Sequence, residues 1–517
     1  MDYFCALQAF DLQSETVTTL RFCTSSNDIY IDNAQYTPRI TQPALSSRAI
    51  FLDGKIGGGA AEQVGVMVLE NSDGALDFIG GYSLVGRELR GYVRDSVGAV
   101  TEIHRYIIGG VDLGDTVTLQ MRDRTDGLRK PLQQNTYSGG NAADSLTGVD
   151  GDKSLSGVKK PLAFGVVCHV EPRLVNHKLL IYQINDGAVF MVASVLLGGS
   201  YRVPGGADYA DLADMYTNSP AAGEWRLLST ANGSYLRLGA AFSFPLAVTF
   251  LTHDPATTAA AAVDLARSVA MERGGLVSGD FVSADLINGR RFSPLVGLSD
   301  DGNLTVADAL DRLTAAAGLF WFLDNFSRLR FVPFAVPGVD DAPVWSFYEW
   351  AIVDIKPAPL VIGGVEAPPW SVKMYYDNNN RPISGTEITG VASTDRKNWL
   401  ENARRSAAAD DATVKTKHLL AQSLEYESVL IARQDAEERG AAVLALLNSG
   451  AGLFDVKIGI DASRFPDNVG AMLAAVDLGA VVLVEFPRYG LSAGKKCAVV
   501  SIAPDYQAQT LLLRVFG

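Results

Sequence analysis

Few residues in this chain could do chemistry, and the clearest candidate is a serine near the C-terminus. Residues 490–494 read GLSAG, which matches the G-x-S-x-G turn that holds a serine nucleophile between a strand and a helix. The residues that follow, KKCAVV at 495–500, have the composition of a strand. The last histidine, His418, precedes the serine, whereas that arrangement needs a later histidine. We therefore interpret residues 490–494 as a hairpin turn and predict no catalytic role for Ser492.

Histidines and cysteines are too scattered to suggest a metal centre. No H-E-x-x-H motif and no CxxC pair occurs, so the sequence predicts neither a zinc hydrolase nor an iron–sulfur site. We expect the cysteines to be buried free thiols. The residues considered are His104, His169, His177, His253, His418, Cys5, Cys23, Cys168 and Cys497.

Two loops and one acidic pair resemble ligand sites only weakly. Residues 54–59 are rich in glycine but fit neither G-x-G-x-x-G nor a Walker loop. Residues 150–154, DGDKS, faintly resemble a calcium loop, but Pro161 occupies the position of the closing glutamate. Glu437 and Glu438 are adjacent in a predicted helix and are interpreted as a solvated face. We therefore predict that the protein is not an enzyme, with no catalytic residue, cofactor-binding residue or metal ligand.

Length and composition limit the class of protein. The chain has 517 residues, is 48% hydrophobic and 20% charged, and carries a formal net charge of -14. This length favours about three or four globular domains, and the acidic balance argues against a protein that sequesters nucleic acid. The longest apolar run, residues 188–197, is too short to cross a bilayer. Met1 is followed by Asp2 and Tyr3 with no basic segment, so we expect no signal peptide.

The rest of the chain can be organised around residues 305–334, TVADALDRLTAAAGLFWFLDNFSRLRFVPF. Thr305 can cap a helix whose first turn contains Asp308. Val306, Leu310, Leu313 and Ala317 form one apolar stripe. Gly318 suits a left-handed helix end, and the aromatic run 319–323 predicts a buried strand that returns as a second strand over 328–332. We predict a helix followed by a hairpin in the core.

This succession resembles a module of the tail hub proteins of bacteriophages. The resemblance lies in the alanine-rich helix, the glycine, the aromatic strand and the D-x-x-x-R-L-R hairpin. Residues 66–79, VMVLENSDGALDFI, with GRELRGYV at 86–93, are similar to the L-x-N-x-D-G-x-L-D and G-R string of the first domain of hub and minor tail proteins. The opening KPLAFG at 160–165 is also similar to phage tail proteins. The resemblance implies tail-tube-like barrels and a place at the tip of a long, siphovirus-like tail.

Strand signals dominate both ends of the chain, and helical signals lie between them. We predict an α+β, mostly β, multi-domain fold with two tail-tube-like β-barrels and smaller helix-plus-hairpin domains between them. The expected domains are a tube-like barrel at 1–125, a β-rich insertion at 126–253, a helix-hairpin domain at 254–400, and a helix with a second tube-like barrel at 401–517.

Two further helices and one irregular stretch are expected. Asp254-Pro255 opens an alanine-rich pattern that predicts a helix to about Arg273. Residues 427–447 predict an amphipathic helix that Gly450 ends. Residues 401–418 have short and charged side chains, and we expect a loop or a loose helix there.

A short internal echo raises the question of duplication. Residues 111–117, VDLGDTV, and 476–482, VDLGAVV, share five of seven letters, and each precedes an expected strand. Chance is one explanation, because such a turn before a strand is common. The other is that the first and last units are related barrels of similar topology, as the resemblance to two-barrel hub proteins implies.

Three functions from different classes remain. The first is the trimeric hub of a phage tail tip or baseplate, a structural virion protein. The second is another tail-tip component, either a hexameric distal tail protein or a carbohydrate-binding adsorption module. The third is a tail-associated cell-wall hydrolase, which the missing catalytic constellation disfavours. Two barrels per chain favour the first, because three copies then present six barrels to a sixfold tail tube.

The resemblance also implies partners. They are the tail tube or distal tail protein, the tape measure protein, tail fibre or receptor-binding proteins, and genomic DNA that passes without sequence-specific binding. An acidic channel wall would repel the DNA backbone and let it slide, although ordinary solubility explains the net charge of -14 equally well. The expected location is the virion, after synthesis in the host cytoplasm.

Overall fold

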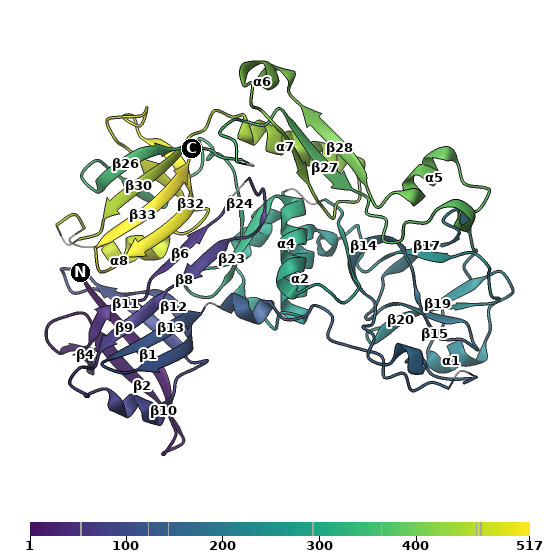
Figure 1. Cartoon of the computed structure of the whole chain (residues 1–517), viewed down its shortest axis with the longest axis horizontal. Helices are drawn as coiled ribbons and strands as arrows, with labels where there is room; N and C mark the ends of the chain where they lie inside the picture. The colour runs from purple at the N-terminus through teal and green to yellow at the C-terminus, as the bar shows by residue number, and fades with distance from the viewer. Residues whose placement is uncertain are drawn as a thin grey trace.

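The computed structural model describes residues 1–51, 54–122, 124–142, 144–291, 294–362, 364–461, 463–465 and 468–517. About 40% of the chain is strand and 18% helix, arranged in several sheets. The prediction of a mostly β, multi-domain α+β fold is therefore confirmed. Figure 1 shows two β units at one end, helices at the centre and a separate β lobe at the other end. Whether the two β units close into tube-like barrels stays a prediction.

The N-terminal unit is a ten-stranded sheet with the order β3-β4-β2-β1-β11-β12-β13-β9-β5, and β10 pairs with β1. Residues alternate between buried and partly buried along β11, as expected for a strand whose side chains point to opposite faces of the sheet. Its strands are β1 (Asp2–Asp11), β2 (Thr16–Cys23), β3 (Ile29–Ile31), β4 (Ala34–Pro38), β5 (Ile40–Gln42), β9 (Val66–Glu70), β10 (Tyr82–Ser83), β11 (Glu88–Arg94), β12 (Val100–Leu113) and β13 (Thr116–Arg122).

The C-terminal unit is an eight-stranded sheet assembled from three distant parts of the chain. Its main path is β25-β31-β32-β33-β30-β26, while β6 pairs with β32 and with β8. Helix α8 (Val469–Ala475) lies against β12 and β11 of the N-terminal unit. The strands are β6 (Ser46–Ala49), β8 (Ala61–Val64), β25 (Trp345–Phe347), β26 (Ile352–Ala358), β30 (Leu453–Gly459), β31 (Val481–Val484), β32 (Lys495–Asp505) and β33 (Thr510–Phe516).

The predicted helix and hairpin of residues 305–334 are present at the centre of the molecule. Helix α4 (Val306–Ala317) begins after Thr305, which exchanges capping hydrogen bonds with Asp308 in the first turn, and ends at Gly318, whose φ of 71° is left-handed. The hairpin of β23 (Leu319–Leu323) and β24 (Leu329–Pro333) follows, and β7 (Gly58–Gly59) pairs with β23. Helices α2 (Ala262–Glu272) and α3 (Ser283–Gly289) pack beside them. All five residues of β23 are buried, as predicted.

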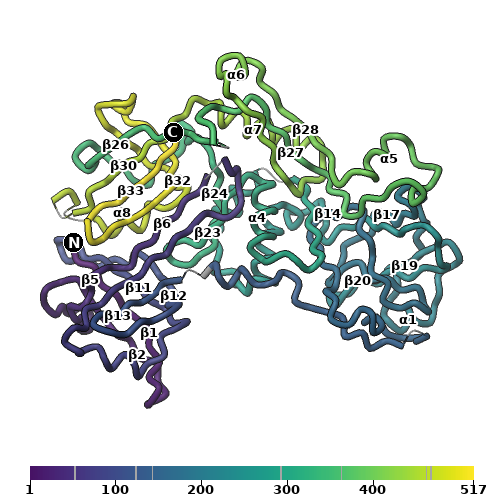
Figure 2. Tube along the Cα trace, viewed as in Figure 1, coloured from purple at the N-terminus to yellow at the C-terminus, as the bar shows by residue number. Residues whose placement is uncertain are grey.

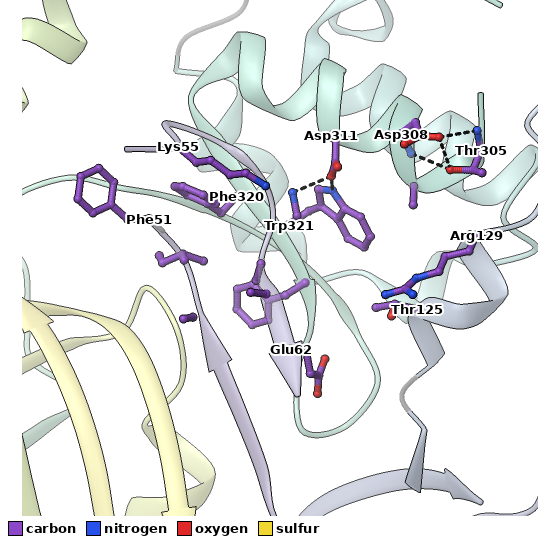
Figure 3. A pocket seen from close by; sticks show the side chains of 17 residues that line it. Phe51, Lys55, Glu62, Thr125, Arg129, Thr305, Asp308, Asp311, Phe320 and Trp321 are labelled. Atoms are coloured by element: carbon purple, nitrogen blue, oxygen red, sulfur yellow. Dashed lines mark hydrogen bonds between the residues drawn. The ribbon is translucent and has the colours of Figure 1, made fainter. Parts of the chain in front are cut away.

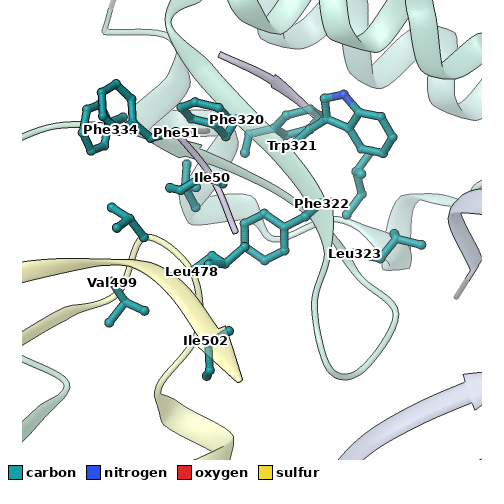
Figure 4. Packing of buried hydrophobic residues seen from close by; sticks show 14 of the residues in the cluster. Ile50, Phe51, Phe320, Trp321, Phe322, Leu323, Phe334, Leu478, Val499 and Ile502 are labelled. Atoms are coloured by element: carbon teal, nitrogen blue, oxygen red, sulfur yellow. The ribbon is translucent and has the colours of Figure 1, made fainter. Parts of the chain in front are cut away.

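The two β units and the helix-hairpin share one continuous apolar core. Phe51, which follows β6, stacks on Phe334 after β24 with ring centroids 4.1 Å apart. The ring centroid of Phe334 in turn lies 4.8 Å from that of Phe516 of β33. Figure 4 shows how side chains of the hairpin meet Leu478 and Val499 of the C-terminal unit. Because these three parts bury apolar surface against one another, we expect them to behave as one body.

The remaining lobe has its own cores and lies apart from the two units, as the trace in Figure 2 also shows. One sheet has the order β18-β17-β21-β14-β22 and the other the order β15-β16-β20-β19. Its elements are β14 (Leu162–Val170), β15 (Arg173–Asn176), β16 (Ile181–Asn185), β17 (Met191–Leu197), β18 (Tyr201–Arg202), α1 (Leu212–Thr217), β19 (Trp225–Thr230), β20 (Gly233–Leu238), β21 (Leu246–Leu251) and β22 (Gly297–Asp300).

A small sheet with the order β28-β27-β29 lies above the central helices in Figure 1 and corrects the expectation for residues 401–418. That stretch contains the strand β28 and the short helix α6, so the expectation of a loop or a loose helix is wrong for residues 405–410. Its short side chains let helix α7 approach: a Cβ on Gly440 would lie 3.7 Å from the Cβ of Ala409. Packing thus overrides low strand propensity. The elements are β27 (Ser371–Tyr376), α5 (Thr394–Glu401), β28 (Arg405–Asp410), α6 (Ala412–Lys417), β29 (Ser423–Tyr426) and α7 (Arg433–Leu447).

Both other predicted helices begin later than expected. Helix α2 starts at Ala262 because Asp254 forms a local turn, accepting from the backbone N–H of Ala256 at 2.9 Å, and Ala261 is extended. Helix α7 starts at Arg433 because the preceding backbone pairs with other strands: Gly297 N–H donates to the carbonyl of Val429 at 2.9 Å. Both helix ends match the prediction to within a few residues.

The echoed segments have different surroundings. Residues 111–117 form the tip of the β12–β13 hairpin, where Leu113 is 52% exposed. Residues 476–482 link α8 to β31, and Leu478 there is buried. The echo therefore gives no structural support for duplication, and related topologies of the two units stay a prediction. In the part of the chain that the structure describes, no helix is both long and apolar enough to cross a membrane.

Candidate functional site

The feature that ties the chain together is the junction between the N-terminal and C-terminal units. The chain passes between sheets there over four consecutive strands. Strand β5 lies in the N-terminal unit, β6 in the C-terminal unit, β7 beside the hairpin and β8 again in the C-terminal unit. The chain then returns to the N-terminal unit at β9. Separating the two units would therefore require breaking strand pairs such as Ser501 with Ala49.

A buried ion pair lies at the centre of this junction. Arg48 of β6 is 4% exposed, and its Nη2 lies 2.9 Å from Oδ1 of Asp477. The same guanidinium donates to the carbonyl of Leu323 at 2.9 Å and to Oδ1 of Asn325 at 2.7 Å. Burial raises the pKa of the Asp477 carboxyl, and the Arg48 charge opposes that shift. One side chain thus joins three segments that are far apart in the sequence.

A stack of buried rings extends the junction toward the N-terminus. The Tyr3 hydroxyl oxygen lies 2.9 Å from Nε2 of His104, and the Tyr106 hydroxyl donates to Oγ of Ser46. Tyr506 stacks on Tyr3 with ring centroids 5.3 Å apart. Burial, followed by the nearby Arg48 charge, lowers the pKa of His104 to about 3. The imidazole is therefore neutral in the folded protein at ordinary pH.

His104 should make the stability depend on pH. Its folded pKa of about 3 lies below the ordinary value of 6.5, so the unfolded chain binds the proton first as the pH falls. Stability should fall as the pH drops from about 6.5 toward 3, by up to about 1.4 kcal/mol per pH unit from this group. The free energy of unfolding, measured by urea denaturation at several pH values in this range, should depend less steeply on pH in His104→Gln than in the wild type. Equal slopes would contradict this assignment.

The pocket beside the hairpin has a volume of about 440 Å³ and is lined by charged and aromatic residues. Figure 3 shows Asp311, Trp321, Lys55 and Glu62 around it. Oδ1 of Asp311 accepts hydrogen bonds from Trp321 Nε1 at 2.6 Å and from the Gly59 backbone at 2.7 Å, and burial raises the pKa of its carboxyl.

The pocket is lined by threonine, charged, aromatic and small apolar residues. Its lining residues include neither histidine nor cysteine nor serine. The Asp308 carboxylate is occupied in the cap of α4, and the Asp311 carboxylate holds β7 against the hairpin. The pocket can accept a small polar molecule, but its residues Asp308 and Asp311 already hold hydrogen bonds within the fold.

The residues singled out in the sequence are not brought together. Ser492 is exposed in the turn between β31 and β32, and a strand follows it as predicted. In the loop that resembled a calcium site, Asp150 accepts from Ser138 N–H at 2.9 Å and lies 3.3 Å from Nζ of Lys160. Asp152 caps a short 3-10 helix. Within the described ranges, no three histidine, cysteine or acidic residues are grouped so that they could hold a metal ion.

Sequence reasoning missed the junction residues. Arg48 lies in a stretch without periodicity, and its partner Asp477 was noticed only as part of the echo. The partners are more than four hundred positions apart, so no local pattern could have connected them.

No protein-family model matches the chain, and no curated protein matches it. Among solved structures, it is similar to a tail protein from Neisseria meningitidis at 10% identity and a TM-score of 0.41, covering 94% of each chain. A prophage tail protein from Shewanella oneidensis matches at 8% identity and a TM-score of 0.41, covering 100% of this chain and 98% of that one. A prophage tail protein from Listeria monocytogenes matches at 8% identity and a TM-score of 0.39, and the match covers 100% of this chain and 94% of that one.

Proposed function

We propose that this protein is a structural component of a phage tail tip, the trimeric hub that connects the tail tube to the host-attachment apparatus and forms part of the DNA ejection channel. The observation that carries the proposal is the junction. It holds two β units side by side through strands β6 and β8, which join the C-terminal sheet, through a buried ion pair and through one continuous core. A pair of sheets joined in this way suits a ring that must keep its shape under force, and the sequence segments similar to hub proteins agree with this proposal.

Open sheet edges support an assembly. In the described chain, β3 and β5 end one sheet, and β25 and β26 end the other. Unpaired edges invite aggregation unless another chain pairs with them or covers them, and closed symmetry removes them. Pro357 blunts β26 because it lacks an N–H donor, so β3, β5 and β25 are the better candidates for contact between subunits. Three copies would present six β units around one axis.

The partners follow from this position. The ring would contact the tail tube or distal tail protein on one side, and fibre or receptor-binding proteins on the other. The tape measure protein and the genomic DNA would pass along its axis, the DNA without sequence-specific recognition. The protein would act in the virion after synthesis in the host cytoplasm, with no enzymatic activity of its own.

Cryo-electron microscopy of the particle tests the proposal. We expect three copies around the tail axis at the tip. Six copies would point to a distal tail protein, and a position away from the axis would point to an adsorption module; either result would overturn the hub assignment. Turnover of purified peptidoglycan by the chain would instead indicate a hydrolase.

The assembled ring should also resist salt. If its contacts are apolar and strand-paired, moderate salt screens exposed charge pairs but leaves the buried surface intact. Native mass spectrometry or light scattering at increasing salt should therefore show a constant trimer mass. Dissociation at moderate ionic strength would contradict an apolar, strand-paired interface.

A further inference from the structure

Helix α6 and the turn after it form a knuckle at the outer edge of the small sheet, visible at the top of Figure 1. We call residues 412–422 the α6 knuckle. It exposes two consecutive leucines: Leu419 is 92% exposed and Leu420 is 73% exposed. Exposed apolar residues that stand singly need no explanation, but two adjacent leucines at a projecting tip are unusual because each costs free energy in water.

The knuckle is held in shape by hydrogen bonds on both sides. The N–H of Asp411 donates to the carbonyl of Trp370 at 2.7 Å, and the N–H of Trp370 donates to the carbonyl of Gln422 at 3.1 Å. Within the turn, the backbone N–H of His418 donates to the carbonyl of Val414 at 2.8 Å, and the N–H of Ala421 donates to the backbone carbonyl of His418 at 2.9 Å. The leucines are therefore presented outward by an ordered turn, anchored at both ends in the small sheet.

The charge of the knuckle is opposite to that of the chain. Residues 412–422 contain Lys415, Lys417 and His418 and no acidic residue, although the whole chain has 58 acidic residues and a net charge of -14. Asp411 stays at the base, where it caps α6 through the N–H of Thr413. Nζ of Lys415 lies 4.3 Å from the ring centre of Trp370. Two lysines thus lie within four residues before the two leucines.

The small size of the apolar tip decides between kinds of partner. A stable protein interface buries about 800 Å² per partner, and two leucines on a convex turn offer far less apolar area. A lipid bilayer adapts to a convex tip, accepts leucine side chains among its acyl chains and attracts flanking lysines to anionic headgroups. Both the apolar and the charged residues of the knuckle then have a partner.

We propose that the α6 knuckle docks on an anionic lipid bilayer. Leu419 and Leu420 enter the boundary between headgroups and acyl chains, and Lys415 and Lys417 lie against the lipid phosphates. The contact is reversible and confined to the surface of the bilayer, and the knuckle does not cross the membrane. It is independent of the oligomeric state proposed above, because a single chain presents the complete knuckle.

Flotation of the full chain with vesicles tests this proposal. The probes are vesicles of phosphatidylglycerol and phosphatidylcholine in equal parts, and vesicles of phosphatidylcholine alone. We expect binding to the anionic vesicles that weakens at high salt and is lost with phosphatidylcholine alone. Each of Leu419→Ser and Leu420→Ser should weaken binding about tenfold, and Lys417→Glu should weaken it at low salt.

The matched control is Val339→Ser. Val339 is also 92% exposed, but Asp340 and Asp341 follow it, so its loss should leave vesicle binding unchanged. All variants alter exposed side chains, and unchanged thermal unfolding should show that they fold. The proposal is overturned if the wild type fails to float with anionic vesicles, or if Val339→Ser weakens binding as much as Leu419→Ser. Leucine-dependent self-association without flotation would assign the knuckle to a second copy of the chain, and would also overturn it.

Discussion

Arg48→Ala should destabilise the junction by about 3–5 kcal/mol, because it leaves the buried Asp477 carboxylate without its cation. The change also removes the donors that reach Leu323 and Asn325. Urea unfolding, together with hydrogen exchange in β6 and β32, should show that these strands open at lower denaturant concentration. Such a loss would establish that the two β units depend on each other.

The matched control for Arg48 is a partly exposed pair of the same chemistry. Arg39 and Asp73 lie 2.8 Å apart, with side chains 19% and 55% exposed, so Arg39→Ala should cost less than about 1 kcal/mol. The double variant Arg48→Met with Asp477→Leu should be milder than Arg48→Ala, because no uncompensated charge remains. Similar losses in Arg39→Ala and Arg48→Ala would rule out a special role for the junction pair.

Trp321→Ala should cost about 3–5 kcal/mol through the cavity it leaves in the shared core. The side chain is 5% exposed and lies where β7, α4 and the hairpin meet. Trp321→Phe keeps most of the bulk but removes the hydrogen bond to Asp311, so it should cost about 1–3 kcal/mol. Calorimetry or chemical denaturation of both variants gives the comparison.

Trp350 provides the control for the tryptophan series. It is 54% exposed on the C-terminal unit and contacts Phe465 with ring centroids 5.4 Å apart. Trp350→Ala should therefore cost less than about 1 kcal/mol. If Trp321→Phe proved as damaging as Trp321→Ala, the hydrogen bond to Asp311 would matter more than the packing, and the cavity explanation would fail.

The sequence by itself determined the features that depend on neighbouring residues. Thr305, Asp308 and Gly318 set the limits of α4 through short-range hydrogen bonds and one left-handed residue. The aromatic run of β23 and its return strand also followed from local composition. The strand after Ser492 could be predicted in the same way, and with it the mismatch to a nucleophile turn.

Only the tertiary structure decided which distant segments meet. Residues 405–410 became a strand because β27 and α7 offered pairing and packing partners, and α7 started late because the preceding backbone had already paired elsewhere. Arg48 and Asp477 met because β6 joins the far sheet. These outcomes depend on burial and on hydrogen bonds between residues that are distant in the sequence, and such free energies leave no periodic trace in the local sequence.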